Sequence, residues 1–282
     1  MRVSILVFTL LIFNACSGSK AISENASTKE IVTETETEIE VEEEVEETEE
    51  VSEEIIIEEE IEETVDIIEV FNHDIWNNLL QKHVSPQGNV NYKGFKADRA
   101  TLQEYLQLLS YKTPDDTWSQ EDKLAYWINA YNAFTVKLII DKYPIKSIKD
   151  INKPWDYRFF KLGSTWYTLN DIEHGRLRKM NDPRIHFAIV CASISCPKLQ
   201  NEAFVASKIN EQLDAVASKF LADSTKNNLN ENTIKLSRIF KWFAKDFKKD
   251  GSLIDFLNKY AAITISQNAK KSYKEYDWNL NE

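Results

Sequence analysis

Long hydrophobic runs are scarce in this 282-residue chain, and the one near the N-terminus is short. The apolar stretch from Val3 to Phe13 would reach roughly 16 Å as a helix, against a hydrocarbon core of about 30 Å. It is therefore too short to remain as a transmembrane helix. The stretch follows Arg2 and precedes Asn14-Ala15-Cys16. That order of charged head, apolar middle and small-residue cleavage site is typical of a signal peptide.

Cysteine is also rare, with three residues in the whole chain: Cys16, Cys191 and Cys196. Ala15-Cys16 resembles a bacterial lipobox, in which the cysteine is lipidated and becomes the new N-terminus, although Phe13 stands where leucine is usual. The alternative is an ordinary secretory signal that contains a cysteine. We expect residues 1–16 to be a lipoprotein signal peptide. The protein is then exported and held in the bacterial cell envelope, at the periplasmic face or the outer membrane, by a lipid on Cys16.

Basic residues are absent between residues 30 and 69, which contain 20 Glu and one Asp. Blocks of like charge repel and stay solvated, so residues 17–70 are predicted to be an acidic tether that is disordered or partly helical. From residue 71 onward the balance reverses, with 31 Lys and Arg against 24 Asp and Glu. Residues 71–282 are predicted to form a single globular domain. Its basic excess is small and no nucleic-acid motif accompanies it, so we expect no nucleic-acid partner.

Apolar spacing predicts three helices in the first half of the domain. They cover residues 75–84, residues 98–109 and residues 119–143. The third is apolar nearly all round, which indicates a central position, and Pro144 ends it.

After Pro144 the spacing of apolar residues changes from the period of a helix to that of a strand. A hairpin is predicted from residues 157–162 and 165–169, and a helix capped by Asn170 and Glu173 is predicted to follow it. The apolar run from Arg184 to Cys191 indicates a strand buried on both faces. The remaining predictions are helices over 202–221, 239–247 and 253–260, with a hairpin turning at residues 230–232. Together they predict an α+β fold, with a helical N-terminal half packed on a small, mainly antiparallel sheet.

Three stretches resemble the domain-of-unknown-function family 547. They run from Leu124 to Phe134, from Trp166 to Arg178 and from Asp182 to Pro197. The closing Tyr276-Asp277-Trp278 also belongs to the resemblance. The resemblance covers roughly residues 72–280. The resemblance implies that the chain is a member of this family, and the activity of the family is unsettled.

Reactive residue types concentrate between Glu173 and Cys196. A thiol nucleophile needs a base or a positive neighbour to lower its pKa from about 8.5, and histidine is the usual partner. We therefore predict Cys191 as nucleophile and His174 as base, with Glu173, Asn129 or Asn132 orienting the imidazole. Histidine precedes cysteine here, unlike in papain. That order fits a circularly permuted papain-like hydrolase, by fold-level analogy alone.

Other interpretations of these residues stay open. Cys191 and Cys196 form an even pair once Cys16 is lipidated, and disulfides persist in exported proteins, so a structural disulfide competes with a catalytic thiol. Inert buried thiols are a third possibility. Cys196 and His186 are alternative catalytic or structural residues, His186 being favoured as a core histidine. His174, His186, Cys191 and Cys196 do not have the spacing of a recognised zinc site, so we expect no metal or other cofactor.

Two functions follow from these alternatives. The first is a membrane-anchored cysteine hydrolase or acyl transferase acting on a peptide or amide bond of an envelope component. The second is a non-catalytic binding or scaffold domain with a Cys191–Cys196 disulfide. The state of the Cys191 thiol distinguishes them.

Overall fold

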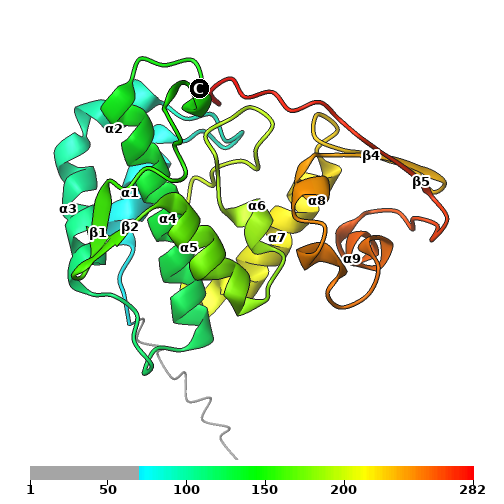
Figure 1. The fold of residues 1–282 in the computed structure, drawn as a ribbon, viewed down its shortest axis with the longest axis horizontal. Coiled ribbons are helices and arrows are strands. Elements are labelled where there is room, and N and C mark those ends of the chain that lie inside the picture. The colour runs from blue at the N-terminus through cyan, green and yellow to red at the C-terminus, as the bar shows by residue number, and fades with distance from the viewer. Residues whose placement is uncertain (1–69) are drawn as a thin grey trace, which may run out of the picture. The chain divides into compact units, whose positions relative to one another are not determined.

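A computed structural model of the chain describes residues 70–282, so the predicted signal peptide, Cys16 and nearly all of the predicted tether lie outside the described residues. The N-terminal half of this part is helical (Figure 1). Its helices are α1 (Asp74–His83), α2 (Tyr92–Ala97), α3 (Arg99–Tyr111) and α4 (Gln120–Lys142). Three of the four were predicted, and the short α2 was not. Within residues 70–282 no helix has the length and apolarity needed to span a membrane.

Helix α4 is the core of the helical half, as its sequence predicts. Every residue from Leu124 to Val136 is buried, because α2, α3, α5 (Leu169–Gly175) and α7 (Ile209–Ala222) pack around the helix. Its first turn is closed by Ser119, whose hydroxyl accepts a hydrogen bond from the Asp122 amide at 3.0 Å. A helix buried on all sides must satisfy its polar side chains inside the protein, and that requirement positions Asn129 and Asn132.

Two corrections concern the segment that carries the candidate residues. The first helix after the hairpin is α5 (Leu169–Gly175), followed by the 3-10 turn η2 (Leu177–Met180). Its cap is Thr168 paired with Asp171, so the predicted cap of Asn170 and Glu173 is wrong. Thr168 donates its amide to Asp171 Oδ2 at 2.8 Å and accepts the Asp171 amide at 3.0 Å. Because the cap is made by this other pair, the Glu173 carboxyl is left free to face the protein interior.

The second correction is that residues 184–191 are not a strand. They begin with a four-residue helix, α6 (Ile185–Ala188). The turn forms because the amide of His186 donates to Pro183 O at 3.3 Å and that of Phe187 to Arg184 O at 2.9 Å. A short apolar run buried on both sides does not reveal its period, which is why the sequence pattern misled.

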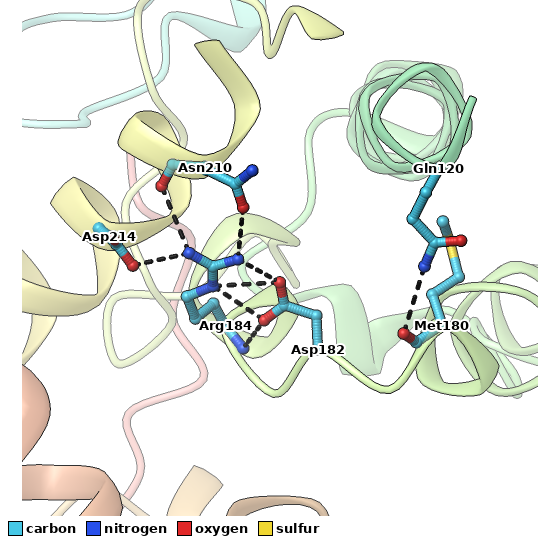
Figure 2. A network of polar contacts seen from close by, with 6 residues as sticks. All are labelled: Gln120, Met180, Asp182, Arg184, Asn210 and Asp214. Carbon is cyan, nitrogen blue, oxygen red and sulfur yellow. Dashed lines mark hydrogen bonds and ion pairs between the residues drawn. The ribbon is translucent and has the colours of Figure 1, made fainter. Parts of the chain in front are cut away.

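Arg184 anchors this turn to the neighbouring helix α7 (Ile209–Ala222). Its guanidinium contacts the Asp182 carboxylate at 2.6 Å, Asp214 Oδ1 at 2.7 Å and Asn210 Oδ1 at 2.8 Å (Figure 2). Figure 2 also shows Gln120, at the start of α4, reaching the carbonyl of Met180. These contacts fix the start of the segment that leads to Cys191.

The sheets are small. Strands β1 (Phe160–Leu162) and β2 (Thr165–Tyr167) form the predicted antiparallel hairpin, turning at Gly163 with φ of 57°. Strands β3 (Asn228–Leu229) and β4 (Thr233–Leu236) form the second predicted hairpin, and β5 (Lys270–Tyr273) adds to β4 in parallel. The α+β prediction is confirmed, with a helical first half and small, mainly antiparallel sheets. The circularly permuted papain-like arrangement stays a prediction.

The remaining elements are helical and connect these parts. They are the 3-10 turns η1 (Ile148–Asp150), η3 (Ala206–Lys208) and η4 (Asp246–Lys248), and the helices α8 (Ile239–Trp242) and α9 (Leu253–Tyr260). Helix α7 starts later than the predicted residue 202, and the predicted helix over 239–247 is divided into α8 and η4. Helix α9 has the predicted bounds and begins at a Ser252–Asp255 capping box.

The C-terminal segment runs back across the domain after β5 and ends near the first helices (Figure 1). Ile194 donates its amide to Asn279 O at 2.8 Å, and Ser195 donates its amide to Asp277 O at 3.1 Å. Further along, Val90 donates its amide to Asn281 O at 2.8 Å. The last residues of the chain are thereby held against the loop that follows Cys191.

Candidate active site

A pocket of about 320 Å³ lies where α4, α5, α8, the loop after α6 and the C-terminal segment meet. It brings together five residues singled out from the sequence: Glu173, His174, His186, Cys191 and Cys196. The other lining residues are Tyr131, Trp155, Asn170, Ile189, Val190, Pro197, Ile239, Trp242, Phe243, Tyr276 and Trp278.

Asn132 of α4 fixes the backbone that leads to Cys191. Its Nδ2 donates to Ala188 O at 2.9 Å, and its Oδ1 accepts from the Val190 amide at 3.0 Å. The side chain is fully buried, so both halves of the amide need these partners. Asn132 thus bonds inside the domain and holds the chain in position directly before Cys191.

The residue after Cys191 has a strained backbone. Ala192 adopts φ of 56°, in the left-handed region that a side chain disfavours, and it is buried. Such strain costs on the order of 1–3 kcal/mol and clusters at functional sites. The loop then closes through a hydrogen bond from the Cys196 amide to Ser193 O at 3.0 Å. Cys191 therefore sits at a sharp turn, and its half-buried side chain lines the pocket.

Two hydroxyl groups contact the Cys191 sulfur. Ser193 Oγ and Tyr276 Oη each lie 3.2 Å from Sγ. Burial works to raise the pKa of the thiol, but hydrogen bonds from Cys196, Ser193 and Tyr276 outweigh it and hold the pKa below its ordinary value. Burial raises the pKa of Tyr276 well above its ordinary range, so this side chain stays a neutral donor. Both hydroxyl groups lie within hydrogen-bond distance of the Cys191 sulfur, where either can donate to a thiolate.

Cys196 is the buried partner of this thiol. Both cysteines are free, and the Cys191 amide donates to Cys196 Sγ at 2.8 Å. Burial and the neighbouring Cys191 raise the pKa of Cys196 well above its ordinary value. The two thiols therefore differ, since the pKa of Cys191 is held below its ordinary value and that of Cys196 well above it, although both side chains line the pocket.

Glu173 carries a buried carboxyl group into the same pocket. Tyr131 Oη donates to Glu173 Oε2 at 3.2 Å. Burial raises the pKa of Glu173 to about 7, against the lowering effect of Tyr131 and Arg178. A carboxyl with this pKa exchanges a proton near neutral pH, which suits general acid or base work.

His174 lies on the exposed face of α5 beside the pocket mouth. Arg178 Nη1 lies 3.0 Å from His174 Nδ1. Burial of the ring and the Arg178 charge lower the pKa of His174, so the ring is neutral at pH 7. Arginine has only donors, so Nδ1 accepts and the proton of the neutral ring lies on Nε2. The hydrogen bonds of Cys191 within residues 70–282 go to Ser193, Tyr276 and Cys196, and none joins it to this histidine.

His186 lines the pocket and belongs to a polar network with Asp246 and Arg178. Its Nε2 lies 2.8 Å from Asp246 Oδ2, and Arg178 grips both oxygens of the same carboxylate at 2.7 and 2.8 Å. The His186 ring stacks on Phe243 with centroids 3.9 Å apart. Burial lowers the pKa of His186. The hydrogen bonds that Asp246 accepts from His186 and Arg178 lower the pKa of Asp246. The network connects His186 and His174 through Arg178 and Asp246.

Asn129 is not brought to Cys191. Its Nδ2 donates to Phe204 O at 2.7 Å, and its Oδ1 accepts the Phe204 amide at 3.1 Å. It is fully buried and holds the segment before α7. Among the described residues, no group of three or more His, Cys, Asp or Glu side chains is arranged to hold a metal ion.

Sequence reasoning missed three groups at this site: Ser193, Asp246 and Tyr276. Ser193 lies two residues from Cys191, and its nearness was a usable signal. Tyr276 stands in the closing motif Tyr276-Asp277-Trp278, but only the return of the C-terminal segment reveals that it meets a residue 85 positions earlier. Nothing in the sequence around Asp246 indicates its two basic partners.

Comparisons with known proteins give one family. No match was found among curated proteins or among solved structures. A family model described as "Protein of unknown function, DUF547" matches residues 116–221, which include Glu173, His174, Cys191 and Cys196 but not Tyr276. This match supports the DUF547 family for the chain.

Proposed function

We propose that the domain is a cysteine-dependent hydrolase or acyl transferase that acts on a peptide or amide bond, with Cys191 as nucleophile. One observation carries the proposal: the Cys191 side chain lines a pocket and its sulfur has two hydroxyl groups, each at 3.2 Å, that can donate to a thiolate. Inert structural thiols lack such donors and lie in apolar surroundings that raise the pKa. The strained turn at Ala192 adds independent support.

The chemistry runs through a thioester. The Cys191 sulfur adds to the substrate carbonyl carbon, forming an S–C bond, and the C–N bond then breaks as the amine leaves with a proton. Water attacks the thioester carbon in a hydrolase, and an acceptor amine attacks it in a transferase. Either attack breaks the S–C bond and returns the thiol. The sulfur and the attacking nucleophile supply the electron pairs for the new bonds, so these steps need no oxidant or reductant.

Glu173 is the proton carrier that we assign, because its carboxyl group lines the same pocket as Cys191. Its pKa of about 7 allows the carboxylate to take the thiol proton and the acid to return it to the leaving amine. His174 presents an Nε2 proton, because Arg178 occupies Nδ1, so it is placed to donate a hydrogen bond rather than to act as the base. Glu173 therefore replaces His174 as the proposed general base, and His174 becomes a donor at the pocket mouth.

The location is part of the proposal and rests on the sequence alone. Residues 1–16 support export and lipidation of Cys16, and the acidic residues 30–69 support a solvated spacer between membrane and domain. The test is mass spectrometry of the mature N-terminus in a bacterial host. Wild type is expected to carry a diacylglyceryl group on Cys16, and Cys16→Ser to carry none.

A binding or scaffold domain with a Cys191–Cys196 disulfide is the second candidate. It is favoured by the closeness of the two residues, since the Cys191 amide lies 2.8 Å from Cys196 Sγ. A disulfide removes the nucleophile, so the two candidates make opposite predictions for thiol labelling.

The experiment is iodoacetamide labelling of the reduced full-length chain between pH 5 and 9, followed at each cysteine peptide by mass spectrometry. We expect Cys191 to label with a midpoint below the ordinary thiol pKa and Cys196 to stay unlabelled. His174→Ala tests whether the imidazole contributes. A Cys191 midpoint at or above about 8.5 would sink the catalytic proposal, as would a disulfide that re-forms and stays closed at the redox potential of the periplasm.

A further inference from the structure

Four aromatic side chains form a cluster on one wall of the Cys191 pocket: Trp155, Trp242, Tyr276 and Trp278. We infer that this cluster is a substrate subsite that takes an aromatic or bulky apolar side chain beside the bond attacked by Cys191. The inference rests on the proposed function and names the substrate class for it.

The cluster is assembled from three distant parts of the chain. Trp155 comes from the loop before β1, Trp242 ends α8, and the other two lie in the C-terminal segment. Tyr276 and Trp278 have ring centroids 4.5 Å apart, Trp242 and Trp278 stack at 5.8 Å, and Trp155 meets Trp278 edge-on at 5.7 Å. Each ring is held by its neighbours before any ligand arrives, which lowers the entropy cost of binding.

The cluster also keeps apolar surface in contact with water. Trp242 is 45% exposed although its ring contacts those of Tyr276 and Trp278. Burying such a ring against a ligand ring removes apolar surface from water and adds an aromatic contact. Tyr276 belongs to the cluster and also touches the Cys191 sulfur at 3.2 Å, so a group bound on the aromatic wall lies next to the reacting atom.

The surface of the pocket is mainly apolar, and several of its polar atoms already have partners in the protein. Asn170 Nδ2 donates to Asp156 at 2.7 Å, Glu173 Oε2 accepts from Tyr131, and His174 Nδ1 is taken by Arg178. A mainly apolar surface favours an apolar group over a polar one, because polar groups that are buried without partners cost binding energy. The volume of about 320 Å³ is at the lower end for ligand sites, and it is sufficient for an aromatic side chain.

The test compares two alkylating reagents on the full-length chain, 2-chloro-N-benzylacetamide and 2-chloro-N-methylacetamide. Each rate at the Cys191 peptide is divided by the rate of the same reagent with glutathione. We expect a benzyl preference of roughly 3- to 10-fold in wild type. Trp242→Ala reduces that preference to about 1, and Trp242→Phe retains part of it. Trp166 is the matched control, since it is 50% exposed and lies in β2 outside the pocket, and Trp166→Ala keeps the preference.

Two results would overturn the inference while leaving Cys191 as a nucleophile. One is fast labelling of Cys191 by both reagents with no benzyl preference, and the other is an equal loss in Trp166→Ala and Trp242→Ala. Ligand-observed NMR compares the binding of N-acetyl-phenylalanine amide with that of N-acetyl-glycine amide. It measures binding at the subsite without using the thiol. Selective binding of the phenylalanine compound to a chain whose Cys191 is unreactive would keep the subsite and refute the hydrolase.

Discussion

Replacing Glu173 by glutamine tests the environment of the buried carboxyl in the pocket. The side chain is 6% exposed, and burial raises its pKa from 4.5 to about 7. The folded chain therefore binds this proton more tightly than the unfolded chain does. The contribution of Glu173 to stability falls as the pH rises from 4.5 to about 7 and stays low above that range.

The magnitude follows from the two pKa values. At 1.36 kcal/mol per pKa unit, the change from 4.5 to about 7 amounts to about 3 kcal/mol. Glutamine does not titrate, and its carbonyl still accepts the hydrogen bond from Tyr131. The free energy of unfolding of Glu173→Gln minus that of wild type is therefore expected to rise by about 3 kcal/mol between pH 4 and pH 8.

The assay is urea unfolding of both proteins at five pH values, followed by intrinsic tryptophan fluorescence. The exposed Glu211, in the first turn of α7, provides the matched control, and the profile of Glu173→Gln is compared with that of Glu211→Gln. A flat profile for Glu173→Gln would refute the raised pKa, and with it the assignment of Glu173 as proton carrier.

Three further predictions concern the groups around the thiol. Tyr276→Phe removes one donor from the Cys191 sulfur, so iodoacetamide labelling of Cys191 at pH 7 slows several-fold. The control Tyr273→Phe on β5 leaves the labelling rate unchanged. Equal rates in wild type and both variants would contradict the donor role of Tyr276. Asn132→Ala leaves a buried carbonyl and a buried amide unpaired and lowers the free energy of unfolding in urea by about 2 to 4 kcal/mol; a loss near zero would refute the anchoring role. Asp246→Asn lowers the stability of the domain at pH 7. Because folding lowers the pKa of Asp246, this loss of stability shrinks as the pH falls below 3.8. A loss of stability in thermal unfolding that stays constant with pH would contradict this.

Much of the fold could be predicted because its strongest signals are local. The apolar residues of α4 and the glycine of the β1–β2 hairpin determine these elements without help from distant parts of the chain. The run from Arg184 to Cys191 was misjudged because burial on both sides erases periodicity, and the turn around Pro183 then decides the conformation.

The site was predicted in part for the same reason. Glu173, His174 and Cys191 lie within one stretch of sequence and share one pocket. Their partners depend on tertiary contacts, since Tyr276 comes from the C-terminal segment and Asp246 from the turn after α8. The proposed role of Glu173 rests on its burial, which no pattern of residues reveals, and the sequence alone favours the histidine as base.

Capture of an acyl group on Cys191 is the most direct test of the nucleophile. The full-length chain is mixed with N-acetyl-phenylalanine 4-nitrophenyl ester, and both released 4-nitrophenol and the mass of the Cys191 peptide are followed. The account predicts a burst of about one nitrophenol per chain and an N-acetyl-phenylalanyl group on that peptide, both lost in Cys191→Ser. An unmodified Cys191 peptide, with nitrophenol release the same in wild type and Cys191→Ser, would contradict it.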